Sequence, residues 1–456
     1  MVRMTWVLVL LALAPQDTAY YNASPDWTAV AEPGIRTDGK PDDSFGQALA
    51  AAGDVNGDGI DDLLVGAPFR ENGPEPGYGK VYLYFGSAAG LPPTAAWTSV
   101  GETFGAERFG GLLEGVGDVD ADGFDDFVVG SEDISNEELF LFRGGPGGPT
   151  AVPAWRFPAE SVGGAGDVNG DGFEDVLAAI FLAGPNDEGV IHLFYGSAAG
   201  LNPRPSWTYV HGDHLQDFGD ELAGLGDVDR DGFDDFAIGN GVFRENPGQV
   251  HVFHGSAAGP PPSPNRRYAD EHVGSFGDSV DGGDLNGDGF GDLLASASRF
   301  GLEEGAMSDV PSGRVYVYLG SPQGLPASPS FTHTPSDRAF FGGTVLNMGD
   351  LDGDGLSEVA VASSQGLEIF AGAAAGYATP SRWSHPADRN PRRLGDANGD
   401  GRTDLVVAED ADGDGSDERV AVFYGRSGGN PVPPPDDGGG DPPLPPGGED
   451  PPPVEP

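Results

Sequence analysis

The chain has 456 residues and a formal net charge of −50, because 73 Asp and Glu residues outnumber 23 Lys and Arg residues. This balance argues against affinity for nucleic acid or for an anionic membrane surface. Cysteine is absent, so no disulfide bond can stabilise the fold.

Residues 1–19 are typical of a secretory signal peptide. Arg3 supplies a positive start, and the apolar core that runs from Trp6 to Ala14 is too short to span a bilayer. Cleavage near Ala14 or Ala19 is expected, with an uncleaved anchor as the alternative. No later apolar stretch in the sequence reaches spanning length. We therefore expect an exported protein that is secreted or displayed at the cell surface.

An acidic motif of nine residues, D-x-[DN]-x-D-G-x-x-[DE], organises the rest of the chain. Its copies are spaced roughly 46 to 66 residues apart, which is typical of repeat architectures. The seven copies begin at Asp54, Asp118, Asp167, Asp227, Asp284, Asp350 and Asp396.

The motif has the chemistry of an oxygen cage. Side-chain oxygens at positions 1, 3 and 5 can converge if the backbone curls, and the Gly at position 6 permits the sharp turn. A carbonyl at position 7 and the acid at position 9 can complete the shell. Such a flexible, all-oxygen set suits Ca²⁺ better than Mg²⁺, and the lack of Cys or His in the motif disfavours zinc. The alternative is a solvated turn without metal.

Each repeat contains four short segments with strand character. In the first repeat, residues 45–50 precede the acidic loop, a buried apolar run at 63–68 follows it, and an alternating strand at 80–86 ends in Gly. A fourth segment carries an aromatic residue, at Trp97, Trp155, Trp207, Tyr268, Phe331 and Trp383 in the first six repeats. A lone four-stranded meander cannot bury both faces, whereas seven can stack as the blades of a propeller.

The strand count predicts how the ring closes. The seventh repeat ends after its third strand, at Gly425, and a matching fourth segment lies at Trp27–Val30. We predict that this segment is the outer strand of the seventh blade. The predicted fold is an all-β, seven-bladed propeller of four-stranded antiparallel blades over residues 20–426. Residues 427–456 are rich in Pro, Gly and acid, which predicts a disordered tail.

The repeats resemble FG-GAP repeats, the unit of the integrin α-chain N-terminal propeller. Phe45-Gly46 and Gly66-Ala67-Pro68 flank the first acidic loop as the family name describes. Phe-Gly recurs at Phe109, Phe218, Phe276 and Phe341, but the third and seventh repeats lack it and only the first has the complete Gly-Ala-Pro. The resemblance covers roughly residues 27–425, and it implies Ca²⁺ in the loops that join strands 1 and 2.

Integrin propellers fill only some of their blades, so seven acidic loops depart from the family and favour a structural role, with about seven Ca²⁺ sites, one per blade. Their ligands would be Asp54, Asn56, Asp58, Ile60 and Asp62; Asp118, Asp120, Asp122, Phe124 and Asp126; Asp167, Asn169, Asp171, Phe173 and Asp175; Asp227, Asp229, Asp231, Phe233 and Asp235; Asp284, Asn286, Asp288, Phe290 and Asp292; Asp350, Asp352, Asp354, Leu356 and Glu358; and Asp396, Asn398, Asp400, Arg402 and Asp404. The motif also fits Asp410, Asp412, Asp414 and Glu418, between strands 2 and 3 of the last repeat. That stretch is either an eighth site or a solvated acidic hairpin.

A four-stranded meander separates two faces of the disc. The acidic loops crowd one face, while the longer connections 68–79, 180–189, 240–248 and 298–313 share the other. In integrins that second face meets ligand and partner chain. Residues 69–72 and 243–246 read Phe-Arg-Glu-Asn in both cases, and they are either binding hot spots or caps of the blades.

We therefore expect a monomeric binding or adhesion module that holds a protein or carbohydrate ligand on the face opposite the calcium loops. No nucleophile–base constellation indicates an enzyme, and His192 and His251 are expected to be packed or edge histidines. One alternative is a secreted hydrolase or lyase that acts on a polysaccharide or ester and uses His211 or His214. Another is a surface-displayed structural protein with the tail as a spacer.

Overall fold

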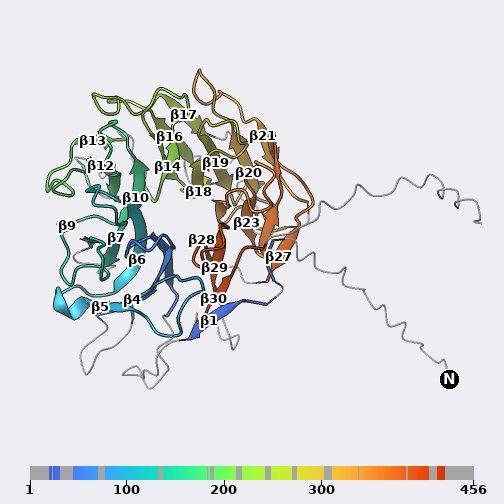
Figure 1. The fold of residues 1–456 in the computed structure, drawn as a ribbon. Helices are drawn as coiled ribbons and strands as arrows, with labels where there is room; N and C mark the ends of the chain where they lie inside the picture. Colours follow the sequence, from blue (N-terminus) through green and yellow to red (C-terminus); the bar gives the residue numbers. More distant parts are fainter. Residues whose placement is uncertain are drawn as a thin grey trace, which may run out of the picture.

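A computed structural model shows a ring of seven four-stranded antiparallel sheets, each of which is one blade of a β-propeller (Figure 1). The structure describes residues 20–22, 24–30, 45–69, 78–131, 137–181, 183–184, 189–211, 218–241, 248–269, 275–301, 311–336, 338–386, 389–409 and 419–426, and the statements below concern these residues. Among them, one 3-10 turn, η1 (Gly101–Thr103), is the single helical element. The prediction of an all-β, seven-bladed propeller is confirmed.

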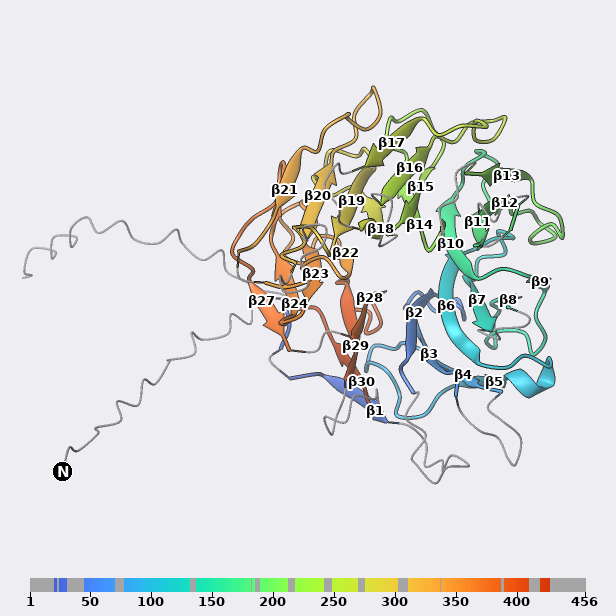
Figure 2. The same cartoon turned by 180° about the vertical axis from the view of Figure 1, so that it is seen from behind.

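Each blade is a meander whose first strand lies nearest the axis of the ring (Figure 2). From the axis outward, the strands are β2 (Ala48–Gly53), β3 (Asp62–Ala67), β4 (Lys80–Tyr84) and β5 (Trp97–Val100) in blade 1; β6 (Phe109–Gly117), β7 (Asp126–Ser131), β8 (Glu138–Phe142) and β9 (Trp155–Phe157) in blade 2; β10 (Ser161–Gly166), β11 (Asp175–Ile180), β12 (Val190–Phe194) and β13 (Trp207–Val210) in blade 3; β14 (Glu221–Gly226), β15 (Asp235–Asn240), β16 (Gln249–Phe253) and β17 (Arg266–Ala269) in blade 4; β18 (Phe276–Gly283), β19 (Asp292–Ala297), β20 (Arg314–Tyr318) and β21 (Phe331–His333) in blade 5; β22 (Val345–Asn347), β23 (Val359–Ser363), β24 (Gly366–Phe370) and β27 (Trp383–His385) in blade 6; and β28 (Arg389–Gly395), β29 (Asp404–Glu409), β30 (Arg419–Phe423) and β1 (Trp27–Val30) in blade 7. A two-stranded hairpin of β25 (Gly372–Ala373) and β26 (Gly376–Tyr377) follows β24.

The N-terminal strand closes the ring. β1 pairs antiparallel with β30, so that Trp27 lies opposite Val422 and Val30 lies opposite Arg419. Strands from the two ends of the described chain therefore share one sheet. This confirms that the segment at Trp27–Val30 supplies the outer strand missing from the seventh repeat.

The strands differ in composition because they differ in surroundings. β3 is buried at all six residues, as expected for a sheet covered on both faces, whereas the outer strand β5 is partly exposed. The inner strands are rich in Ala and Gly because neighbouring backbones approach closely near the axis. A Cβ at Gly115 would lie 2.3 Å from the carbonyl oxygen of Ala51 in the next blade.

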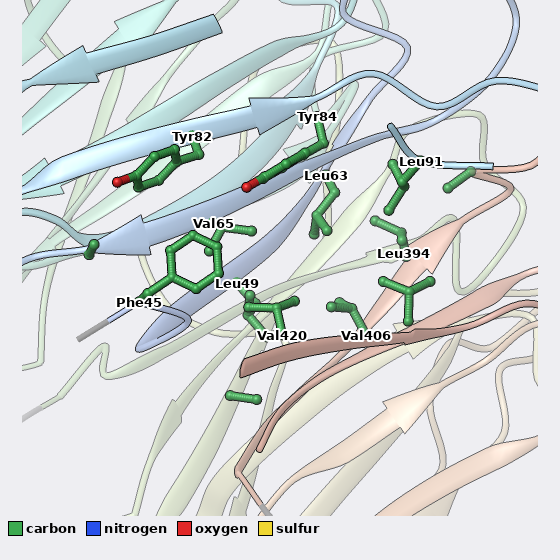
Figure 3. Close-up of a cluster of buried hydrophobic side chains, with 14 residues drawn as sticks. Phe45, Leu49, Leu63, Val65, Tyr82, Tyr84, Leu91, Leu394, Val406 and Val420 are labelled. Carbon is green, nitrogen blue, oxygen red and sulfur yellow. The ribbon is translucent and has the colours of Figure 1, made fainter. Parts of the chain in front are cut away.

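The hydrophobic core lies between blades. Seven clusters of buried side chains form, and each joins two neighbouring blades. The cluster at the closing junction brings Phe45, Leu49 and Val65 of blade 1 against Val406 and Val420 of blade 7 (Figure 3). No blade can bury its apolar faces alone, so stability depends on completion of the ring. Within the described residues, no helix is long and apolar enough to cross a membrane.

Candidate metal centre

The seven acidic loops join the first and second strands of the blades, as predicted. The acid at position 1 holds the loop backbone in its curled form. In blade 1, Asp54 Oδ1 accepts hydrogen bonds from the amides of Gly57 and Asp58 at 2.8 and 2.9 Å, and its Oδ2 accepts one from Gly59 at 2.7 Å. In every loop this acid accepts bonds from the amides at positions 5 and 6.

The acid at position 5 continues the curl. In blade 1, Asp58 Oδ1 accepts a hydrogen bond from the amide of Ile60 at 3.1 Å, so the predicted position-7 residue contributes its N–H to the loop. Its carbonyl as a metal ligand stays a prediction. The backbone at position 4 has φ between 53° and 83° in all seven loops, and two of these residues, Ala121 and Arg230, are not glycine. The loop conformation is therefore set by the array of acceptors as well as by glycine.

The acid at position 9 is the most enclosed member of each loop. All seven of these side chains are fully buried, and each accepts backbone hydrogen bonds from position 2 of its own loop and from the Gly that lies two residues after the third strand. In blade 1, Asp62 accepts from Val55 at 3.2 Å and from Gly86 at 2.9 Å. Burial raises the pKa of Asp62 to about 8, with Asp58 and Asp54 adding repulsion. A cation beside such a carboxyl group would favour its ionised form.

Carboxylate oxygens converge closely in three loops. Ligand atoms from positions 1, 3 and 5 lie within 4.8 Å of one another in blade 2 (Asp118, Asp120, Asp122) and blade 4 (Asp227, Asp229, Asp231). In blade 6 the convergent atoms come from positions 1, 3 and 9 (Asp350, Asp352, Glu358). In the other four loops position 3 is Asn, and in two of them its Oδ1 accepts the position-5 amide, at 3.0 Å for Asn286 and 2.9 Å for Asn398.

Unpaired oxygen atoms in these loops fit a cation. Among the described residues, Asp120, Asp229 and Asp352 each have a buried Oδ1 without a hydrogen-bond partner. The Asp120 side chain is only 3% exposed. A buried carboxylate oxygen with no donor is unfavourable, and a hard cation with oxygen ligands would satisfy it. The donor set thus fits Ca²⁺, and it contains no sulfur.

The loops divide into two kinds by the residue at position 3. We call the loops with Asn56, Asn169, Asn286 and Asn398 the Asn-type loops, and those with Asp120, Asp229 and Asp352 the Asp-type loops. Each position-3 Asp meets one basic side chain of its own blade. Arg143 lies 2.6 Å from Asp120 Oδ2, His254 lies 3.2 Å from Asp229 Oδ2, and Arg382 lies 3.4 Å from Asp352 Oδ2.

The basic partners come mainly from one structural position, directly after the third strand. Arg143 and His254 occupy it in blades 2 and 4, whereas the Asn-type blades carry Phe85, Tyr195, Leu319 and Tyr424 there. Blade 6 has Ala371 at this position, and Arg382 reaches the loop from the turn before β27. Nothing in the nonapeptide itself signals this pairing, since the partners lie more than twenty residues away.

A second role missed from the sequence belongs to position 8. Asp125, Asp234 and Asp61 each accept a hydrogen bond from the position-1 amide of the loop in the preceding blade, at 2.8, 2.9 and 2.7 Å. The last of these bonds joins blade 1 to blade 7. The motif leaves position 8 unspecified, but four of the seven copies have an acidic residue there, and this recurrence could have indicated the role. The loops therefore contribute to the attachment of each blade to the next.

Several predicted residues lie outside the described part of the chain. They are the eighth motif with Asp410, Asp412, Asp414 and Glu418, the histidine His214, and most of the two Phe-Arg-Glu-Asn segments. Among the described histidines, His251 is fully buried in β16, and His211 stacks on it at 4.9 Å between ring centroids. His192 bonds the hydroxyl of Thr208 at 2.9 Å. These three rings occupy the blades themselves, away from the acidic loops.

The sequence matches known repeats and known chains. Residues 45–84, 218–253 and 276–318 match the FG-GAP repeat, and residues 350–407 match an FG-GAP-like repeat. A segment of 127 residues is 37% identical to integrin alpha-7 of Homo sapiens, covering 28% of this chain and 10% of that one. A segment of 198 residues is 30% identical to integrin alpha-4 of Xenopus laevis, covering 43% and 14%.

Each of these integrin matches covers only a short part of the relative's own sequence. The chain spans about a tenth of the length of the integrin alpha-7 chain that it matches. Among solved structures, the Dos1 propeller aligns over 86% of this chain and 81% of that chain, with a TM-score of 0.45 and 10% identity, which is too weak a likeness to support an argument.

Proposed function

We propose that this chain, a β-propeller with four stretches that match FG-GAP or FG-GAP-like repeats and a segment similar to integrin alpha-7, is a calcium-stabilised binding module of the extracellular space or the cell surface. The repeat family and the integrin likeness support a binding role. The acidic loops support calcium as the structural cation. Residues 1–19, with the features of a signal peptide, support export.

The main support for calcium as the structural cation is the set of buried, unpaired carboxylate oxygens at Asp120, Asp229 and Asp352. The residues that would hold the ion are the side chains at positions 1, 3, 5 and 9, with the position-7 carbonyl. Bound Ca²⁺ would supply positive charge that the acidic loops otherwise lack, and it would fix each loop against the next blade. Its role would be structural rather than catalytic.

The ligand is proposed to be a protein or a carbohydrate held on the face opposite the calcium loops. Connections between strands 2 and 3 and between blades meet on that face. One contact places the guanidinium carbon of Arg108 5.2 Å from the centre of the Phe69 ring, joining the connection that leads into blade 2 to the connection after β3. Arg is among the residue types that are enriched in binding hot spots.

The test is a binding screen of the full chain in millimolar calcium against extracellular-matrix proteins and a glycan array. We expect saturable binding to at least one member, lost on chelation and restored by Ca²⁺. Arg108→Glu should weaken this binding, whereas Arg266→Glu on the exposed outer strand β17 should leave it unchanged. Absence of saturable binding in calcium, together with turnover of a polysaccharide or ester, would overturn the proposal.

A further inference from the structure

The ring encloses a central channel that the acidic loops do not use. It is a cavity of about 650 Å³, lined by residues from the innermost strands of all seven blades, β2, β6, β10, β14, β18, β22 and β28. This volume lies in the range of small-molecule sites, about 300–1,000 Å³. Six of the lining residues are charged, and most of the others are small or aliphatic.

Three of these charges lie at the same height in the channel. Glu114 is paired with Val128, Asp281 with Leu294, and Arg392 with Val406. In each case the partner is two residues beyond the position-9 acid, so the three side chains occupy one register position in blades 2, 5 and 7. The other four blades carry Ala50, Gly163, Ala223 and Leu346 at this position. Two carboxylates and one guanidinium are thus distributed around the axis.

These charges influence one another without forming ion pairs. Burial raises the pKa of Glu114 to about 7, with Arg392 acting in the opposite direction and Asp281 adding to the rise. Within the described residues, no ion pair joins these three side chains, and no hydrogen bond reaches the Glu114 carboxylate. The Asp281 carboxylate accepts hydrogen bonds from the backbone amides of Gly282 and Asn347. Arg392 donates a hydrogen bond to the carbonyl of Pro391 at 3.0 Å. The cavity that these charges line, about 650 Å³, leaves room for another molecule.

Two further acidic residues, Asp220 and Glu221, line the cavity beside Glu114 and Asp281. Glu221 faces the same cavity, and burial raises its pKa to about 8, with Asp220 adding repulsion. The channel is lined by four carboxyl groups, those of Glu114, Asp220, Glu221 and Asp281, and by two guanidinium groups, those of Arg392 and Arg393. Near neutral pH the raised pKa values leave Glu114 and Glu221 only partly ionised, and an ammonium group beside either would favour its ionised form. A ligand with more ammonium than carboxylate groups would match this set.

A single metal ion does not fit this arrangement. Among the described residues, the acidic groups that come within reach of one ion lie in the blade loops, and none of the channel carboxylates forms such a group. An occupant that meets charges from several blades would reach across the cavity with more than one charged group. Leu112, Leu222 and Leu346 also line the cavity and provide apolar contacts for an alkyl chain between those groups.

We propose that the central channel binds a small zwitterion with a second amino group on an alkyl chain, the chemistry of lysine. Its carboxylate would meet Arg392, and its two ammonium groups would meet Glu114 and Glu221. Arg is suited to a carboxylate because its donors form a planar fork. This site is separate from the calcium loops and from the outer face proposed for the macromolecular ligand.

The test is isothermal titration calorimetry of the full chain with L-lysine, at constant calcium and ionic strength. We expect saturable binding that weakens at least about tenfold in Glu114→Gln and in Arg392→Gln. Cadaverine, which lacks the carboxylate, and L-norleucine, which lacks the side-chain ammonium, should each bind at least about tenfold more weakly than lysine. Cadaverine affinity should change little in Arg392→Gln, since cadaverine has no group for that guanidinium.

The matched control is Arg156→Gln, which removes an exposed ion pair with Glu138 on the outside of blade 2 and should leave lysine affinity unchanged. Circular dichroism of each variant checks the fold, and the two channel variants remove opposite charges, so a shared misfolding effect is distinguishable. No lysine binding at tens of millimolar, or equal affinity in both channel variants and wild type, would overturn the proposal. Either result would leave calcium-dependent binding on the outer face untouched.

Discussion

The Asn-type and Asp-type loops share one backbone and differ in one atom and one neighbour. In both kinds, position 1 caps the curled backbone and position 9 is buried against two amides. In the Asp-type loops, position 3 brings a fourth carboxylate together with a basic side chain. In the Asn-type loops position 3 is a neutral amide, so the carboxylates at positions 1, 5 and 9 remain. In blades 2 and 6 the partner of position 3 is Arg, whose positive charge offsets the fourth carboxylate.

The residue at position 3 therefore varies together with a second residue of the same blade. The outer atom of an Asp is an acceptor that suits a guanidinium or imidazole, whereas the outer atom of an Asn is an amide donor. Asn56 Nδ2 is buried and has no acceptor among the described residues, so a basic donor placed there would add a second unpaired group. A donor facing a donor is unfavourable, and the pairing of Asp with Arg or His avoids it.

The largest expected effect tests whether the two kinds of loop both hold calcium. Chelation should lower the melting temperature by on the order of 10 °C or more, since an ion held only by the folded loops would stabilise only the folded chain. Ca²⁺ should restore the melting temperature better than Mg²⁺, which demands a stricter octahedral shell. Differential scanning calorimetry measures both. An unchanged melting temperature on chelation would contradict the calcium assignment.

Metal analysis of the same sample sharpens the comparison. A stoichiometry near seven indicates that both kinds of loop are filled, whereas four would restrict calcium to the Asn-type loops and three to the Asp-type loops. We expect seven, because both kinds of loop share the carboxylates at positions 1, 5 and 9 and the same curled backbone. An eighth ion would assign the acidic stretch at residues 410–418 as a further site.

The next effect concerns what the two kinds of loop share. Asp62→Ala in an Asn-type loop and Asp235→Ala in an Asp-type loop should each lower the free energy of unfolding by about 3 kcal/mol, because each leaves two buried backbone amides without an acceptor. Denaturant unfolding in saturating calcium measures both. If only one of the two variants is destabilised, the loops differ in more than position 3.

A smaller effect isolates the difference itself. In the presence of chelator, Arg143→Gln should lower the free energy of unfolding by about 2 kcal/mol, since it leaves the buried Asp120 carboxylate without its cation. The loss should shrink in saturating Ca²⁺, because the ion then supplies the positive charge. Adding Asp120→Asn should recover most of the stability, as it converts blade 2 to the Asn type. A double variant as unstable as the single one would contradict charge matching.

The smallest effect is expected in blade 6. Arg382→Gln should cost only about 0.5 kcal/mol under the same conditions, because the Arg382 side chain is 42% exposed and its pair with Asp352 is long, at 3.4 Å. Parallel denaturant titrations of this variant and Arg143→Gln give the comparison. A larger loss in the Arg382 variant would show that burial does not control the strength of these pairs.

The features that could be predicted from the amino-acid sequence are the ones encoded in short, repeated segments. The nonapeptide, the apolar run after it and the alternating third strand recur with a fixed order, and this order determines strand number, blade number and the place of each acidic loop. The closing role of Trp27–Val30 also followed, because a seventh repeat with three strands requires a fourth from elsewhere. Periodicity and composition act over a few residues, so they are readable without a structure.

The contacts between side chains of different segments became known from the folded structure alone. The pairing of Asp120 with Arg143 depends on how a third strand returns past its own loop. The meeting of Glu114, Asp281 and Arg392 depends on the register of three inner strands and on closure of the ring. These contacts join residues from about 20 to almost 280 positions apart, and their energy is recovered only after the chain has closed over that distance. No local pattern carries such information, because the same residues would be ordinary surface charges in an open array of blades.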